Sequence, residues 1–187
     1  MRNIEDKAQM FDLDALIKPE EFIAAAETED ELGCVLRMHL CLERYLDEFA
    51  EKNTPEEDKK FHLKRQTFAG KLSLAVAYGL SKPIAECIYL INRIRNDFAH
   101  KGGISLKNDD IAKLADLVDE ISVPLVPKEP SVKHSWIELC AARPGEQLGY
   151  GKCGARIDFV LVCAALLKKS SGWLVMDYLK RNPHIIK

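Results

Sequence analysis

The segment from residue 93 to residue 100 combines side chains that can hold a phosphate and move a proton. Arg93, Arg95, Asn96 and His100 fall in the predicted last two turns of one helix. Guanidinium groups bind phosphate oxygens through forked hydrogen bonds, and an asparagine amide can orient a phosphate or a ring. A histidine near a helix C-terminus is favoured in its protonated form, which suits general acid catalysis. The segment therefore predicts a phosphodiester site that needs no metal and no cofactor.

The spacing within this segment sets how the side chains project. Arg93, Asn96 and His100 follow at steps of three and four, so we expect them on one stripe of the helix. Arg95 falls on the apolar face, where an arginine must reach solvent, pair with a carboxylate or face a ligand. Basic residues in a last helical turn also often only bind the helix's own carbonyls. The spacing alone is therefore a weak signal of function.

A long helix earlier in the chain supplies candidate neighbours for Arg95. Glu43 and Asp47 lie on it, and either could be the buried carboxylate that Arg95 requires. His39 falls on the apolar face of the same helix and is expected to be a core or interface residue. His100 is therefore the histidine with the strongest claim to chemistry.

The elements that must position these residues are helices. Apolar residues recur at steps of three and four, and no alternating strand pattern is evident. We expect Thr28 and Glu31 to form a capping box, Asn108 or Asp109 to cap a later helix, and Gly79 to end one. Helices are predicted over 29–51, 67–78, 84–99, 108–121, 155–169 and 173–179, and a further helix is predicted to start at Pro19. The stretches 53–60 and 143–154 are predicted to be connections. Pro124, Pro127 and Pro130 mark a linker. The predicted fold class is all-α, a helical bundle of about six to seven helices.

Length and composition fit one cytoplasmic domain. The 187 residues suit a single domain with a core over about 28–170 and peripheral ends at 1–18 and 180–187. The net charge of −2 argues against a broadly basic nucleic-acid-binding surface. No apolar leader and no run of about 18 apolar residues is evident, so no membrane span is expected. The six cysteines lack metal-ligand spacing and are predicted to be reduced thiols, four of them buried.

Several segments resemble one known family in matching order. The segment 91–100, INRIRNDFAH, resembles the RNxxxH signature of HEPN domains. The segment 68–80, FAGKLSLAVAYGL, resembles the F-x-x-K-I-x-L-A-x-x-L-G-L helix of the mannitol operon repressor-like branch of that group. The long helix with Leu42 and Glu43 resembles the first core helix of the branch, and the segment 157–159, IDF, resembles the start of its last helix. The resemblance spans roughly residues 30–170.

The resemblance implies a helical bundle that forms a homodimer. In active HEPN members, the motif arginine and histidine form a metal-independent RNase site at the dimer interface. Carried over, these are Arg95 and His100, with Asn96 as the polar residue after the arginine. Arg93 also satisfies the longer form of the motif, so the choice of arginine stays open. A two-fold dimer would supply the two histidines that RNA cleavage through the 2′-hydroxyl requires.

Three functions fit these expectations. The first is an RNA-binding protein or metal-independent endoribonuclease, with RNA as its partner. The second is a non-catalytic transcriptional regulator that acts through protein–protein contacts, as described for mannitol-repressor-like proteins. The third is a sensor of a nucleotide or small anion that uses the same arginines. Sequence-specific DNA binding is not expected, because no helix-turn-helix with a basic recognition helix is evident.

Overall fold

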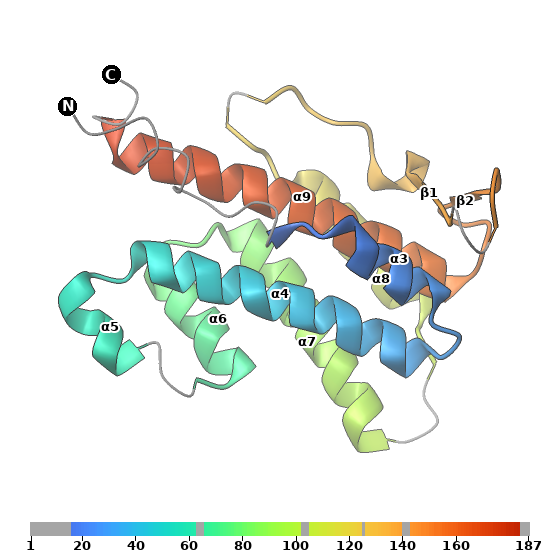
Figure 1. The fold of residues 1–187 in the computed structure, drawn as a ribbon, viewed down its shortest axis with the longest axis horizontal. Coiled ribbons are helices and arrows are strands. Elements are labelled where there is room, and N and C mark those ends of the chain that lie inside the picture. Colours follow the sequence, from blue (N-terminus) through green and yellow to red (C-terminus); the bar gives the residue numbers. More distant parts are fainter. Residues whose placement is uncertain (1–15, 63–65, 102–104, 125, 140–142, 184–187) are drawn as a thin grey trace.

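The chain folds as an all-α bundle, as the sequence predicts (Figure 1). The computed structural model describes residues 16–62, 66–101, 105–124, 126–139 and 143–183. Seven α-helices lie within these ranges, together with one short 3₁₀ helix and two short strands. They are α3 (Pro19–Glu27), α4 (Glu31–Asn53), α5 (Glu56–His62), α6 (Phe68–Ala77), α7 (Lys82–Lys101), α8 (Asn108–Glu120), η1 (Val132–His134), β1 (Trp136–Glu138), β2 (Gln147–Gly149) and α9 (Ala155–Arg181).

Helix α4 lies at the centre of the bundle and packs against α3, α6, α7 and α9, while α8 packs against both α7 and α9 (Figure 1). Its inward side chains are fully buried and include Met38, Tyr45 and Phe49. The Tyr45 hydroxyl donates to the backbone carbonyl of Ser170 on α9 at 3.3 Å. Burial of these large side chains provides the main stabilisation of the bundle.

Local residues explain where several helices begin and end. Pro19 occupies the first turn of α3, as predicted, because its missing N–H costs nothing there. Gly79 follows α6 with φ of 93°, a backbone conformation that favours glycine, and it ends the helix as predicted. The expected capping box is wrong. Asp30 caps α4 by accepting from the Gly33 N–H, whereas the Thr28 hydroxyl donates to the Ala24 carbonyl at the end of α3.

Other boundaries also differ from those predicted. Lys107 occupies the N-cap of α8 without a side-chain cap bond, so the predicted cap at Asn108 or Asp109 is wrong. The predicted connection over 53–60 contains most of α5. Helix α9 is continuous through Gly172, where two helices were expected. Glycine has a low helix propensity, but buried residues before and after Gly172, such as Ser171 and Leu174, hold the helix in place by packing.

The region before α9 holds an antiparallel pair of three-residue strands that the sequence pattern did not predict. Trp136 pairs with Gly149, and Glu138 pairs with Gln147. A three-residue strand is too short to show an alternating pattern. The pair lies at one end of the bundle, beyond the start of α9, and leaves the helical fold class unchanged (Figure 1).

One face of α4 carries exposed leucines. Leu32 and Leu36 are 41% and 38% exposed, and Leu40 is 56% exposed. The three residues lie four apart, so they form one row, which we call the leucine row. The helices that pack on α4 cover its other faces, and this row remains open in the single chain.

Helix α9 is also long and apolar enough to cross a membrane, by length and composition alone; among the described residues it is the one helix that meets this test. In the bundle, 61% of its 18-residue apolar window is buried. A core helix passes the same test, and burial against α4 and α8 is what a core helix shows.

Candidate functional site

An open cleft of about 370 Å³ lies where α7 faces α4 and the start of α6. Helix α4 contributes one apolar-face histidine and one acidic residue, and α7 contributes the arginine and asparagine that begin the RNxxxH motif. The lining residues are His39 and Glu43 from α4, Thr67, Phe68 and Ala69 from the start of α6, and Asn92, Arg95 and Asn96 from α7. We call this the Arg95 cleft.

Arg95 is half-buried in this cleft, and its hydrogen bonds are incomplete. Its Nη1 donates to Asn96 Oδ1 at 3.1 Å. Its Nε is buried and has no hydrogen-bond partner among the described residues. A guanidinium with unused donors beside a cleft can bind an anion through a forked pair of hydrogen bonds. The arrangement therefore suits a phosphate or carboxylate group.

The expected carboxylate partner of Arg95 is not seen. Glu43 and Asp47 both pair with Lys71 on α6, with oxygen–nitrogen distances of 2.9 and 2.8 Å. Lys71 thus balances one of these two negative charges, and Glu43 still lines the cleft. Because no described carboxylate pairs with Arg95, its positive charge remains available to a ligand.

His39 joins the cleft from α4, and it is 7% exposed. Its Nε2 lies 3.2 Å from Asn92 Oδ1; because an amide oxygen only accepts, the ring donates through Nε2. The ring also stacks on Phe68, with centroids 3.9 Å apart. Burial lowers the pKa of His39, and the charge of Arg95 lowers it further, against the opposing effect of the Asn92 hydrogen bond. His39 is therefore neutral at neutral pH.

The first turn of α6 lies at the cleft. Thr67 is the N-cap, and its hydroxyl accepts from the Gly70 N–H at 3.1 Å. The N–H groups in the first turn of a helix lack intrahelical acceptors, and the helix dipole is positive at this end. Phe68 and Ala69 occupy this turn and line the cleft. The helix start and Arg95 thus present positive potential to the same space.

Three of the four residues predicted from the motif have side chains in the described part of the structure, and these three divide between two sides of α7. Arg95 and Asn96 line the cleft. Arg93 points to the side of α8, where its Nη2 donates to Asp110 Oδ1 at 2.7 Å. His100 lies in the last turn of α7, and its side chain is outside the described part of the structure. Of the two candidate arginines, Arg95 is therefore the one without a carboxylate partner among the described residues.

Several residues of this cleft were not predicted from the sequence to be site residues. His39 was interpreted only as a core or interface residue, and its burial agrees with that, but it also lines the cleft. Asn92 lies three residues before Arg95, a spacing that places both on one side of a helix. Thr67 carries the usual signal of an N-cap hydroxyl. Among the described residues, no three histidine, cysteine, aspartate or glutamate side chains gather as metal ligands.

Comparison with family models, with curated proteins and with solved structures gave no match to this chain. The resemblance to HEPN domains therefore stays a prediction that rests on the motif residues and their order.

Proposed function

We propose that this chain is a HEPN-like protein that binds RNA and cleaves it without a metal, with Arg95 and His100 as the catalytic pair. The observation that carries the proposal is the state of Arg95. Its guanidinium lines an open cleft, pairs with no described carboxylate, and has a buried Nε without a partner. An RNA phosphate supplies the acceptor oxygens that this group lacks.

The proposed reaction uses the 2′-hydroxyl of RNA as its nucleophile. A base takes the 2′-proton while that oxygen attacks phosphorus, and an acid protonates the departing 5′-oxygen. The products are a 2′,3′-cyclic phosphate and a 5′-hydroxyl end. We assign the acid to His100, because the C-terminus of α7 favours the protonated ring. Arg95 stabilises the charge that builds on the phosphate oxygens, and Asn96 orients the Arg95 guanidinium.

We propose that a second copy of the chain supplies the base. One chain provides one motif histidine, whereas a two-fold dimer brings two together. The leucine row supports this arrangement because exposed apolar rows of this kind are commonly covered by a partner. Leu36 and Leu40 lie three residues from His39 and Glu43 respectively, and these two residues line the cleft. A dimer seam on this face of α4 would lie next to the Arg95 cleft.

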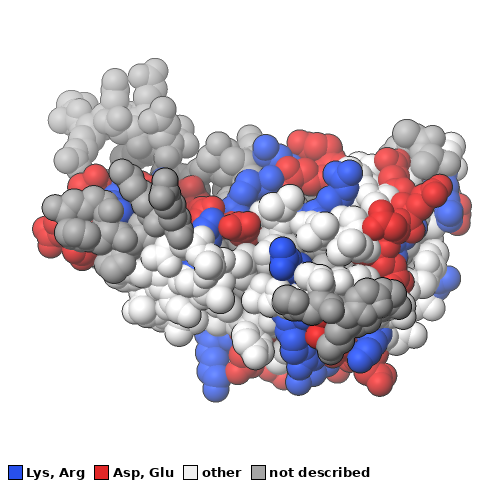
Figure 2. Space-filling model, turned by 90° about the horizontal axis from the view of Figure 1, so that it is seen from below, with Lys and Arg blue, Asp and Glu red and all other residues white. Residues whose placement is uncertain are grey.

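A non-catalytic regulator that acts through protein contacts is the alternative. Figure 2 shows a face of the molecule where basic and acidic side chains surround a broad uncharged area, with no continuous basic tract. Extended nucleic-acid-binding surfaces are usually strongly basic, so this surface favours a protein partner. Under this alternative, the Arg95 cleft would bind a small anion or an acidic side chain of the partner.

We propose the cytoplasm as the compartment for either function. The five described cysteines are free thiols, and burial raises the pKa of Cys34, Cys41 and Cys87 to about 12. Free thiols of this kind fit a reducing compartment.

The experiment is incubation of the purified protein with mixed RNA in EDTA, compared with three single variants. We expect cleavage by the wild-type protein and a loss of at least about 100-fold for His100→Ala and for Arg95→Ala. Arg93→Ala serves as the matched control, because Arg93 is two residues from Arg95 on the same helix but pairs with Asp110. Equal losses for Arg93→Ala and Arg95→Ala would contradict the assignment of Arg95. An inactive wild-type protein would favour the regulator.

A further inference from the structure

A second cavity of about 370 Å³ lies away from the Arg95 cleft, between the end of α8, the chain that follows it and α9. Ile121 and Val123 provide apolar lining, and Gly172 of α9 also lines the cavity, where an added Cβ would lie 3.4 Å from Val123. A volume of this size is at the lower end of the range of small-molecule sites. The cavity is therefore large enough for a small organic molecule.

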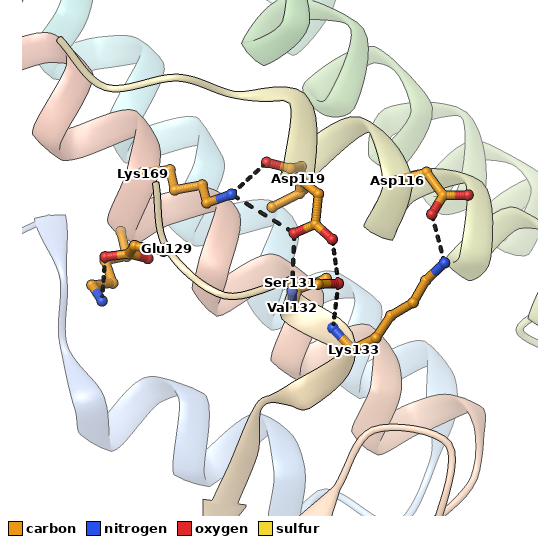
Figure 3. A network of polar contacts seen from close by, with 9 residues as sticks. Asp116, Asp119, Glu129, Ser131, Val132, Lys133 and Lys169 are labelled. Atoms are coloured by element: carbon orange, nitrogen blue, oxygen red, sulfur yellow. Dashed lines mark hydrogen bonds and ion pairs between the residues drawn. The ribbon is translucent and has the colours of Figure 1, made fainter. Parts of the chain in front are cut away.

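A buried lysine lines this cavity. Lys169 is 8% exposed, and its Nζ donates to the Val118 carbonyl at 2.9 Å (Figure 3). Asp119 Oδ1 lies 3.8 Å from the same nitrogen, which is an ion pair but too long for a hydrogen bond. An ammonium group has three donors, so among the described residues one of the three is used. The remaining donors can hydrogen-bond to a molecule in the cavity that Lys169 lines.

Other hydrogen bonds engage the Asp119 carboxylate, so it does not accept a hydrogen bond from Lys169. Its carboxylate accepts from the Ser131 hydroxyl and from the Val132 N–H, the latter at 2.9 Å (Figure 3). Burial would raise the pKa of Asp119, but these hydrogen bonds and the nearby Lys169 outweigh burial and hold the pKa below its ordinary value. The Asp119 carboxylate therefore stays charged and balances the charge of Lys169 from 3.8 Å away.

The charges around the cavity indicate what kind of ligand fits. Three lysines and three carboxylates line the cavity, so their charges sum to zero. They are Lys128, Lys168, Lys169, Asp119, Glu120 and Glu129. Lys168 and Glu129 pair with each other at 2.7 Å. The C-terminus of α8, the negative end of the helix dipole, also faces Lys169. An anion beside Lys169 would meet Asp119 and this helix end, whereas an uncharged oxygen would not be repelled.

We propose that this cavity binds a small, uncharged and largely apolar molecule whose carbonyl or hydroxyl oxygen accepts a hydrogen bond from Lys169. The apolar part of the ligand contacts Ile121 and Val123. This site is independent of the Arg95 cleft and of RNA cleavage.

The test uses the fluorescent ketone 6-propionyl-2-(dimethylamino)naphthalene, which is uncharged, mostly apolar and carries one carbonyl. We expect saturable binding to the wild-type protein with a blue-shifted emission. Lys169→Met keeps most of the side-chain volume and removes the donor, so binding weakens about tenfold. Gly172→Leu adds a bulky side chain to the cavity wall, against Val123, and abolishes saturable binding. Lys180→Met is the matched control, because Lys180 is an exposed lysine on the same helix, and it leaves binding unchanged.

Three results would overturn the proposal. They are absence of saturable binding to the wild-type protein, unchanged binding to Gly172→Leu, and equally strong binding of the anionic probe 1-anilinonaphthalene-8-sulfonate at the same site. Circular dichroism first establishes that each variant is folded. If Lys169→Met does not fold, the result with Gly172→Leu decides.

Discussion

At the scale of single residues, Arg95 brings to the cleft between α4, α6 and α7 a guanidinium that pairs with no carboxylate among the described residues. Its hydrogen bond to Asn96 uses one donor, and its buried Nε is free of partners among the described residues. The nearby carboxylates of Glu43 and Asp47 are engaged by Lys71. These contacts support the proposal that Arg95 binds a ligand rather than forming a structural ion pair.

The first prediction concerns the stability of Arg95→Ala. Because no described carboxylate is left unpaired, we expect a loss of less than about 1 kcal/mol in the free energy of unfolding. Lys71→Met should cost about 1 kcal/mol, because it leaves Glu43 and Asp47 without their shared cation. Urea unfolding measures both. A loss of about 3–5 kcal/mol for Arg95→Ala would mean that Arg95 has a buried partner after all.

The second prediction concerns His39 and pH. The folded-state pKa of His39 is lowered by burial, so the unfolded chain takes up its proton first, near pH 6.5. This contribution to stability is present above pH 6.5 and is lost as the pH falls. His39→Gln keeps a donor for Asn92 but cannot titrate. Between pH 7 and pH 5 its melting temperature should fall less than that of the wild-type protein; parallel curves would contradict the lowered pKa.

The sequence predicted some features of the site and not others. The position of Arg95 on the apolar face of its helix follows from spacing within one helix, and the side chain is half-buried there. The partner of Glu43 could not be predicted, because Lys71 reaches it from another helix 28 residues away. The hydrogen bond between His39 and Asn92 likewise depends on how α4 and α7 pack, and no local sequence pattern specifies that packing.

At the scale of elements, the long amphipathic helices were predictable, and short or context-dependent elements were not. Helices α4, α6, α7 and α8 appear close to their expected ranges because each has a regular apolar period. Helix α5 has seven residues, and each strand has three, too few for a period to be evident. Continuation of α9 through Gly172 depends on tertiary packing, which overrides the low helix propensity of glycine.

The third prediction concerns how α8 holds the segment that follows the prolines. Asp119 accepts from Ser131 and from the backbone of Val132, and it is partly buried. Asp119→Ala leaves these donors unpaired, so we expect a loss of about 1–3 kcal/mol. Asp116→Ala is the matched control: it lies three residues away on α8 and pairs with exposed Lys133, so its loss should stay below about 0.5 kcal/mol. Equal losses in thermal unfolding would argue against a structural role for Asp119.

At the scale of the whole molecule, the leucine row is the surface that we expect a second copy to cover. A charge at Leu40, the most exposed of the three leucines, would have to be buried in the dimer at high cost. The fourth prediction is that Leu40→Glu shifts a wild-type dimer to a monomer in sedimentation at micromolar concentration and reduces RNA cleavage with it.

The control for this variant is Val76→Glu, because Val76 is 50% exposed on α6 and lies outside the leucine row. It should leave the dimer intact. A wild-type protein that sediments as a monomer, or a dimer that survives Leu40→Glu, would contradict the proposed seam.

The most direct measurement of the central claim is the chemistry of the RNA ends left by the purified wild-type protein in EDTA. Proton transfer by histidine with charge stabilisation by Arg95 predicts 2′,3′-cyclic phosphate and 5′-hydroxyl ends, and His100→Ala should abolish both. Cleavage that stops in EDTA, returns with magnesium and leaves 5′-phosphate ends would contradict the account.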